Sequence, residues 1–144
     1  MTIFTIGYTN KTAAKFFELI RMNEIDTLID VRRYNTSQLA GFAKGRDLEY
    51  FLSRICNCNY VWATQFAPTA ALLDDYKKNR INWNEYEKIY HSLLDVQDLL
   101  FFEDYANKRI CLLCAEDSPA RCHRRLLAER VAEIYPNAEV KHLY

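Results

Sequence analysis

Short hydrophobic runs alternate along this chain with longer segments in which apolar residues recur at helical spacing. Runs typical of buried strands occupy residues 3–7, 28–31, 60–62, 110–114 and 140–143. Strands that alternate with helices favour right-handed crossovers and a parallel sheet covered on both faces. With no internal repeat and no linker, the pattern predicts one three-layer α/β domain over residues 1–144, with a five-stranded, mainly parallel sheet.

Polar residues mark where several of the helices should begin. Thr12 and Asp47 are expected to act as N-caps, because each precedes an apolar stripe of helical period. The pair Ser118-Pro119 predicts the start of the last helix, since proline fits the first helical position. Residues 64–107 are helical in pattern throughout, more than a parallel crossover needs. Most of their aromatic side chains are expected in the core, and part of this segment is expected to cover the site as a lid.

Composition and charge narrow the class of protein. The 144 residues are 50% hydrophobic and 26% charged, and 19 basic residues balance 19 acidic ones. Zero net charge disfavours binding of nucleic acid or anionic lipid by bulk electrostatics. No apolar stretch approaches the roughly 18 residues of a membrane span. The first residues lack the pattern of a signal peptide, and five cysteines fit reduced thiols better than a disulfide framework. We therefore expect a cytoplasmic protein.

The candidate chemistry follows the ends of the predicted strands. In open parallel sheets, ligands bind beyond the carboxyl ends of the strands, so residues that follow different strands are expected to meet there. The candidate catalytic residues are Cys114, Glu116 and Cys122. The candidate ligand-binding residues are Tyr8, Asp30, Arg32, Lys44, Arg121, His123 and Arg124.

The segment from Cys114 to Arg124 carries most of these groups. Cys122 is expected in the first turn of the last helix, where unpaired N–H groups and the helix dipole favour a thiolate. Arg121 and Arg124 are three residues apart and would be neighbours on a helix, where they could bind an anion. The structural alternative is that Cys114 fills the core and that the arginines pair with acidic neighbours. In the same way, Asp30 either forms a simple ion pair with Arg32 or orients it toward a substrate.

Other chemistries are disfavoured by spacing. A metal site would need Cys114, Cys122 and His123, but adjacent residues on a helix diverge by about 100°. A phosphatase-like loop misses its cysteine-to-arginine spacing by one residue, and the glycine-rich nucleotide loops are missing. A thiol–disulfide cycle between the two cysteines is opposed by the nearby carboxylate of Glu116. No metal and no cofactor are therefore expected.

Several blocks of the chain resemble the domain-of-unknown-function family 488. They are Thr5-Ile6-Gly7-Tyr8-Thr9-Asn10, Leu28-Ile29-Asp30-Val31-Arg32, Gly41-Phe42-Ala43-Lys44, Leu112-Leu113-Cys114-Ala115-Glu116 and Cys122-His123-Arg124. The family usually has histidine and serine where this chain has Tyr8 and Thr9, and proline near the place of Asn35. The resemblance implies an α/β fold and a site built from these blocks.

Together these features favour an enzyme that acts on a small anionic or nucleotide-like ligand. Arg32, Arg121 and Arg124 would bind the anion, a thiol of Cys114 or Cys122 would react, and Glu116 would serve as general acid or base. The alternative is a non-catalytic module that binds a nucleic acid end or a protein partner through Arg32, Arg33, Lys44, Arg46, Arg124 and Arg125. A third hypothesis is redox sensing, in which oxidation joins Cys114 to Cys122. The substrate, the reaction and the oligomeric state stay open.

Overall fold

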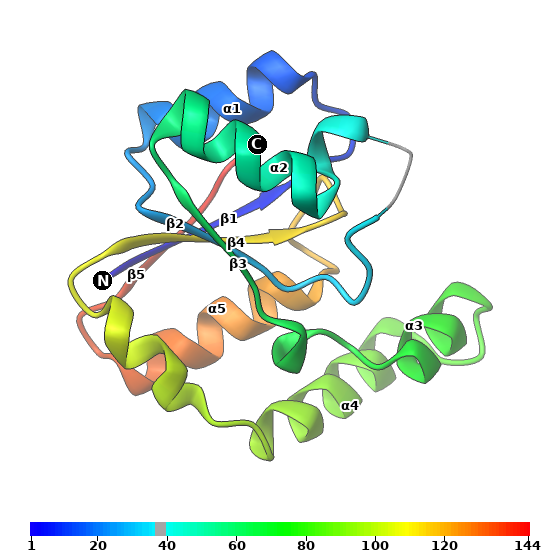
Figure 1. Cartoon of the computed structure of the whole chain (residues 1–144). Coiled ribbons are helices and arrows are strands. Elements are labelled where there is room, and N and C mark those ends of the chain that lie inside the picture. Colours follow the sequence, from blue (N-terminus) through cyan, green and yellow to red (C-terminus); the bar gives the residue numbers. More distant parts are fainter. Residues whose placement is uncertain (37–39) are drawn as a thin grey trace.

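A computed structural model, which describes residues 1–36 and 40–144, contains an open sheet of five parallel strands (Figure 1). The strands are β1 (Thr2–Gly7), β2 (Thr27–Asp30), β3 (Asn59–Trp62), β4 (Arg109–Cys114) and β5 (Glu139–His142). Their order is β3-β2-β4-β1-β5, and each neighbouring pair is parallel. The α/β fold is confirmed, and each strand lies within one residue of the apolar run that predicted it.

Helices cover both faces of the sheet. The α-helices are α1 (Ala13–Met22), α2 (Gly45–Phe51), α3 (Ala70–Lys77), α4 (Trp83–Asp95) and α5 (His123–Ile134). Shorter segments are the 3-10 turns Gly41–Ala43, Thr64–Phe66 and Leu99–Tyr105 and the π-helical turn Leu52–Cys56. Figure 1 shows α1 and α2 on one face and α4 and α5 on the other. None of the described helices is long and apolar enough to cross a bilayer.

Of the three helix starts predicted from sequence, the structure confirms one and places the other two at different residues. Thr12 caps α1, and its hydroxyl accepts a hydrogen bond from the backbone N–H of Lys15 at 3.1 Å. The prediction that Asp47 caps the second helix is wrong: α2 begins at Gly45, and Asp47 lies in its first turn. The prediction that the last helix begins at Ser118-Pro119 is also wrong, because α5 begins at His123 with Cys122 as its N-cap.

The two sides of the sheet bury separate cores. Successive side chains of a strand point to opposite faces, so Cys111 and Leu113 of β4 pack on the α1 and α2 side, whereas Ile110 and Leu112 pack on the other. Most aromatic residues of the long crossover lie in the core, as expected: Phe66, Tyr86, Tyr90 and Phe102 are buried. Trp83 and Phe101 are partly buried and pack against this core. By the same alternation, Cys114 ends β4 on the face that α4 and α5 cover.

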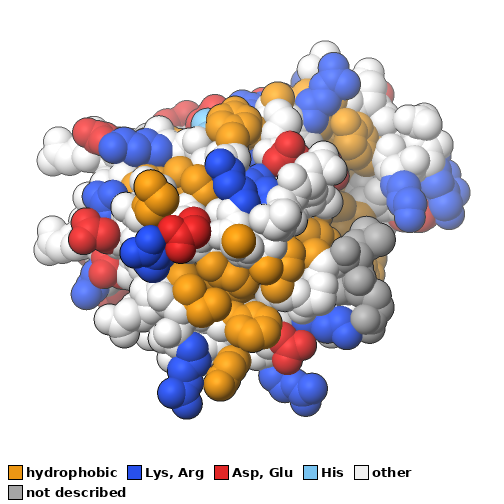
Figure 2. All heavy atoms as spheres, turned by 90° about the horizontal axis from the view of Figure 1, so that it is seen from above, with side chains coloured by type: hydrophobic (Ala, Val, Ile, Leu, Met, Phe, Trp, Pro, Cys, Tyr) orange, Lys and Arg blue, Asp and Glu red, His pale blue; other side chains and the backbone are white. Residues whose placement is uncertain are grey.

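The outer face of α1 and α2 is partly apolar. Figure 2 shows hydrophobic side chains gathered on this side of the molecule. A shallow groove of about 300 Å³ lies between the two helices there and is lined by Ala13, Ala14, Phe17, Glu18, Phe42, Phe51 and Ile55. This groove is on the opposite side of the sheet from Cys114.

Candidate functional site

The topology places a crevice at the carboxyl end of β4. This strand lies between β2 and β1, and the connections that leave those two neighbours run to the α1 and α2 face. The chain that leaves β4 runs to the opposite face and enters α5. Open α/β sheets bind ligands where adjacent connections diverge in this way. The sequence prediction of a site at this edge therefore has a topological basis.

The loop between β4 and α5 is fixed to the end of β1. A side chain on Gly7 would collide with the carbonyl of Glu116, so this close approach requires glycine. The Thr9 hydroxyl donates to the Ala115 carbonyl at 2.7 Å, and the Lys11 ammonium pairs with Asp117 at 2.8 Å. The loop is therefore a fixed part of the site.

The side chain of Arg124 also holds the loop between β4 and α5 in place. Its guanidinium is fully buried and donates to the carbonyls of Glu116 and Asp117. These contacts give the physical reason why α5 does not begin at Ser118: the carbonyls that precede the helix are held in a loop by the side chain of Arg124. The structure thus engages Arg124 with backbone oxygens, in place of the anion that the sequence suggested.

Two cysteines and a histidine meet where β4 ends and α5 begins. The Cys122 thiol donates a hydrogen bond to the Cys114 sulfur, with the two Sγ atoms 2.9 Å apart. The Nδ1 atom of His123 lies 3.7 Å from the Cys114 Sγ and 4.0 Å from the Cys122 Sγ. The other ring nitrogen, Nε2, lies 2.7 Å from the carbonyl oxygen of Val31. Because a carbonyl only accepts, Nε2 carries a proton and Nδ1 faces the sulfurs.

The contacts within the cluster shift the pKa values of its two thiols in opposite directions. The hydrogen bond from Cys122, aided by the charges of His123 and Arg124, holds the pKa of the Cys114 thiol well below its ordinary value although burial opposes this. Burial and the hydrogen bond that it donates to Cys114 raise the pKa of Cys122 well above the ordinary value. Burial tends to lower the pKa of His123, but the charge of Cys114 and the hydrogen bonds to Cys114 and to the Val31 carbonyl together outweigh it, and the net pKa is raised. The arrangement favours a thiolate at Cys114, a thiol at Cys122 and a cationic imidazole.

The same three side chains are the candidate metal ligands in the part of the chain that the structure describes. Their ligand atoms lie within 4.8 Å of one another. The sequence argument that Cys122 and His123 must diverge rests on a wrong premise, because Cys122 is an extended N-cap and not a helical residue. Two sulfurs on a tetrahedral zinc, with bonds of about 2.3 Å, stand roughly 3.8 Å apart. The observed 2.9 Å is shorter, so the two sulfurs stand closer than a shared tetrahedral zinc would hold them.

Arg32 is held in a buried ion pair at the end of β2. Its guanidinium donates to both carboxylate oxygens of Asp30, at 2.8 and 2.7 Å, and to the carbonyl of Ala43 at 2.8 Å. The Tyr60 hydroxyl donates to the same carboxylate at 2.6 Å, and the ring of Tyr8 lies beneath the guanidinium. The ion-pair interpretation of Asp30 and Arg32 therefore describes what the structure contains, with Tyr8 packed against it.

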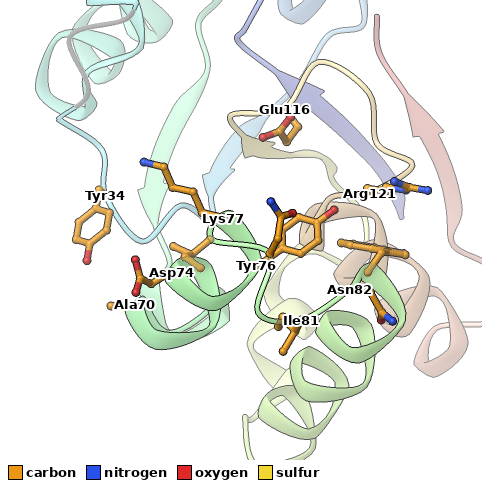
Figure 3. A pocket seen from close by; sticks show the side chains of 12 residues that line it. Tyr34, Ala70, Asp74, Tyr76, Lys77, Ile81, Asn82, Glu116 and Arg121 are labelled. Carbon is orange, nitrogen blue, oxygen red and sulfur yellow. The ribbon is translucent and has the colours of Figure 1, made fainter.

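A pocket of about 960 Å³ lies between the loop after β4 and the helices α3 and α4 (Figure 3). It is lined by Tyr34, Ala70, Leu73, Asp74, Tyr76, Lys77, Asn79, Ile81, Asn82, Trp83, Glu116 and Arg121. Of the candidates from sequence, Glu116 and Arg121 line it, whereas Lys44 lies at the start of α2. The loop residues Glu116 and Arg121 come from one side and α3 and the start of α4 from the other. The helical crossover thus forms a wall of the pocket, where sequence analysis expected a lid.

Sequence reasoning missed the residues that the crossover contributes. Lys77 adds a cation near Arg121, and Tyr76 and Trp83 add aromatic surface. The signal in the sequence was the excess length of this crossover, which did not identify individual side chains.

Tyr86 connects the pocket wall to the thiols. Its ring stacks on Trp83, with centroids 5.0 Å apart, and lies 5.1 Å from the ring of Tyr76. Tyr86 in turn stacks on Tyr90, with centroids 6.4 Å apart, and the ring of Tyr90 lies 5.5 Å from that of His123. Arg121, which lines the pocket, directly precedes Cys122 in the chain. The thiols themselves are buried behind these packed rings.

No curated protein and no solved structure matches this chain. A family model does: it matches residues 12–131 of the 144 and so includes β2 to β4 and most of α5. The chain therefore belongs to the family described as Domain of unknown function DUF488.

Proposed function

We propose that this protein is a thiol-dependent enzyme that acts on a small anionic or nucleotide-like ligand bound at the carboxyl edge of the sheet. The observation that carries the proposal is the position of Cys114. Its sulfur accepts a hydrogen bond from Cys122 at 2.9 Å and lies 3.7 Å from Nδ1 of His123, and Glu116, two residues further along the chain, lines a pocket that holds two cations. A hydrogen-bond donor and a nearby positive charge are what convert a weakly acidic thiol into a nucleophilic thiolate.

The pocket supplies separate groups for binding and for proton transfer. Arg121 and Lys77 carry the positive charge that an anionic ligand needs, since Arg32 and Arg124 are engaged by Asp30 and by backbone carbonyls. Glu116 presents a carboxylate to the same pocket and is the candidate general acid or base. The reduced thiols that this chemistry requires fit a reducing, cytoplasmic compartment.

A non-catalytic module that binds nucleic acid or protein is less well supported. Its basic residues would have to share a surface, but Arg46 lies on α2 and Arg125 on α5, on opposite faces of the sheet. Arg33 donates to the carbonyls of Pro68 and Ala67, and Arg125 pairs with a carboxylate on its own helix. These charges are dispersed and largely paired.

The test is the rate of thiol alkylation as a function of pH, resolved by mass spectrometry for each cysteine. Cys114 is expected to react with iodoacetamide well below the pH near 8.5 at which an ordinary thiol is half ionised. Small phosphates and nucleotides should slow this reaction, and Arg121→Ala should weaken that protection. Arg21→Ala, on the exposed side of α1, is the matched control and should leave the protection unchanged.

Uniformly slow alkylation of Cys114 across the pH range would refute a thiolate at this position. Rapid alkylation that no anion slows would leave the thiolate but refute the proposed ligand class.

A further inference from the structure

The second thiol of the cluster can do more than donate a hydrogen bond to the nucleophile. An imidazole and a helix N-terminus suffice to lower the pKa of a cysteine. Here Cys122 adds a sulfur 2.9 Å from the sulfur of Cys114, well inside van der Waals contact. A second sulfur in that position is what an enzyme needs to resolve a covalent intermediate formed on the first.

We propose that the Cys114–Cys122 pair reduces a small disulfide that carries carboxylate groups, with the ligand bound in the pocket beside Arg121 and Lys77. This inference rests on the proposed thiolate enzyme and names its substrate class and reaction.

The reaction proceeds by two exchanges. The Cys114 thiolate attacks one sulfur of the substrate R–S–S–R, forms a Cys114–S–R bond and releases RS⁻. Cys122 then passes its proton to this first RS⁻, attacks the Cys114 sulfur and forms the Cys114–Cys122 disulfide, which expels the second RS⁻. That group takes from solvent the proton that Cys114 lost when it ionised. In sum, one protein dithiol and one R–S–S–R give one protein disulfide and two RSH. The substrate gains two electrons and the protein loses two.

Hydrogen bonding assigns the two roles. Cys114 is 6% exposed and Cys122 is 3% exposed, so both residues are buried and burial does not distinguish them. Cys122 donates its proton to Cys114 and so stays protonated until the first exchange removes the negative charge. Closing the disulfide requires the sulfurs to approach from 2.9 Å to about 2.05 Å, less than one ångström of movement.

The pocket selects the charge of the substrate. Arg121 and Lys77 suit carboxylates, and Asp74 and Glu116 suit ammonium groups of the same molecule. Its volume of about 960 Å³ is at the upper end of the range for small-molecule sites. The carboxylate of Glu116, which was expected to oppose a thiolate, is exposed at this pocket and screened by water, whereas His123 and Arg124 act directly on Cys114.

The experiment uses the reduced full chain and glutathione disulfide, followed by intact mass and by the amount of glutathione released. The protein should lose two hydrogen atoms and release two glutathiones per chain. Cys122→Ser should stop at a mixed disulfide, with one glutathione mapped to Cys114. Cys114→Ser and Cys114→Ala should form neither product, and Cys56→Ser, a partly exposed cysteine outside the cluster, should behave as the parent chain.

A cationic disulfide, cystamine, serves as a second probe that tests the charge preference of the pocket. Cystamine should react about tenfold more slowly than glutathione disulfide, because it has no carboxylates to pair with Arg121 and Lys77. Arg121→Ala should reduce this preference. Equal rates with the two probes would overturn the substrate class.

The outcomes separate this inference from the proposed function. If Cys114 alkylates at low pH but Cys122→Ser captures no glutathione, the disulfide reaction is wrong and the thiolate enzyme stands. If Cys114 is unreactive, both fail. Stoichiometric zinc that blocks alkylation of both cysteines would identify a metal centre and overturn the inference. If the Cys114 variants do not fold, mapping the adduct of Cys122→Ser decides the question.

Discussion

Replacing Asp30 with asparagine tests whether the Asp30–Arg32 pair is structural. The change keeps the shape of the side chain but removes its charge and one acceptor. Asp30 is fully buried and accepts from the Arg32 guanidinium at 2.7 and 2.8 Å, from the Arg32 backbone N–H at 3.1 Å and from the Tyr60 hydroxyl at 2.6 Å. In Asp30→Asn the guanidinium stays buried without a counter-charge.

The expected loss is large. Removing one partner of a buried ion pair costs about 3–5 kcal/mol, because the remaining charge is uncompensated. Tyr60→Phe removes a hydrogen bond to the carboxylate and should cost about 1.5–3 kcal/mol. Removing both charges should be less damaging than removing one, so Asp30→Asn/Arg32→Met should be more stable than Asp30→Asn by about 1–2 kcal/mol.

Equilibrium unfolding in urea, followed by circular dichroism, measures these differences. In a thermal melt, a loss of this size lowers the midpoint by roughly 10 °C. The matched control is Glu18→Gln, which breaks an exposed ion pair with Arg21 on α1 and should leave the midpoint unchanged. A change below about 1 kcal/mol in Asp30→Asn, or a double variant no more stable than the single one, would refute the buried-charge argument and restore Arg32 as a free ligand-binding group.

Three further predictions concern the loop and the thiols. Gly7→Ala should destabilise the protein by about 1–3 kcal/mol in urea unfolding, because its methyl group meets the carbonyl of Glu116; a neutral effect would mean that the loop moves freely. Arg124→Met should increase hydrogen exchange in the loop over residues 115–122, because two carbonyls lose their donors, and unchanged protection would contradict this role. Cys122→Ala should shift the alkylation midpoint of Cys114 to higher pH, whereas Cys122→Ser, which keeps a hydroxyl donor, should shift it less; equal shifts would show that the hydrogen bond does not lower the Cys114 pKa.

Much of the fold was predictable because the signals that specify it are local. The apolar run at residues 110–114 marks β4, and Thr12 precedes the stripe of α1 that it caps. Since parallel strands end at the same edge, the sequence also indicated that Asp30 and Glu116 follow strands at one edge of the sheet. These inferences need only neighbours in the chain and the handedness of crossovers.

The partners of the charged side chains were not predictable in the same way. Arg124 was expected to bind an anion, but it contacts carbonyls that the fold brings over its side chain. Lys11 pairs with Asp117, 106 residues away, and the Thr9 hydroxyl donates to the equally distant Ala115. Such contacts depend on how the strands are ordered in the sheet, which no local pattern encodes.

The sequence by itself determined the strands, the parallel sheet and the gathering of reactive residues along one edge, because periodicity and chain order suffice for these features. Only the tertiary structure decided where α5 begins, and with it the direction of Cys122. Because the loop after β4 packs against Gly7 and Arg124, α5 begins only at His123. Cys122 is therefore extended, and its sulfur contacts that of Cys114. The contact between the two sulfurs is a product of packing between β1, β4 and α5.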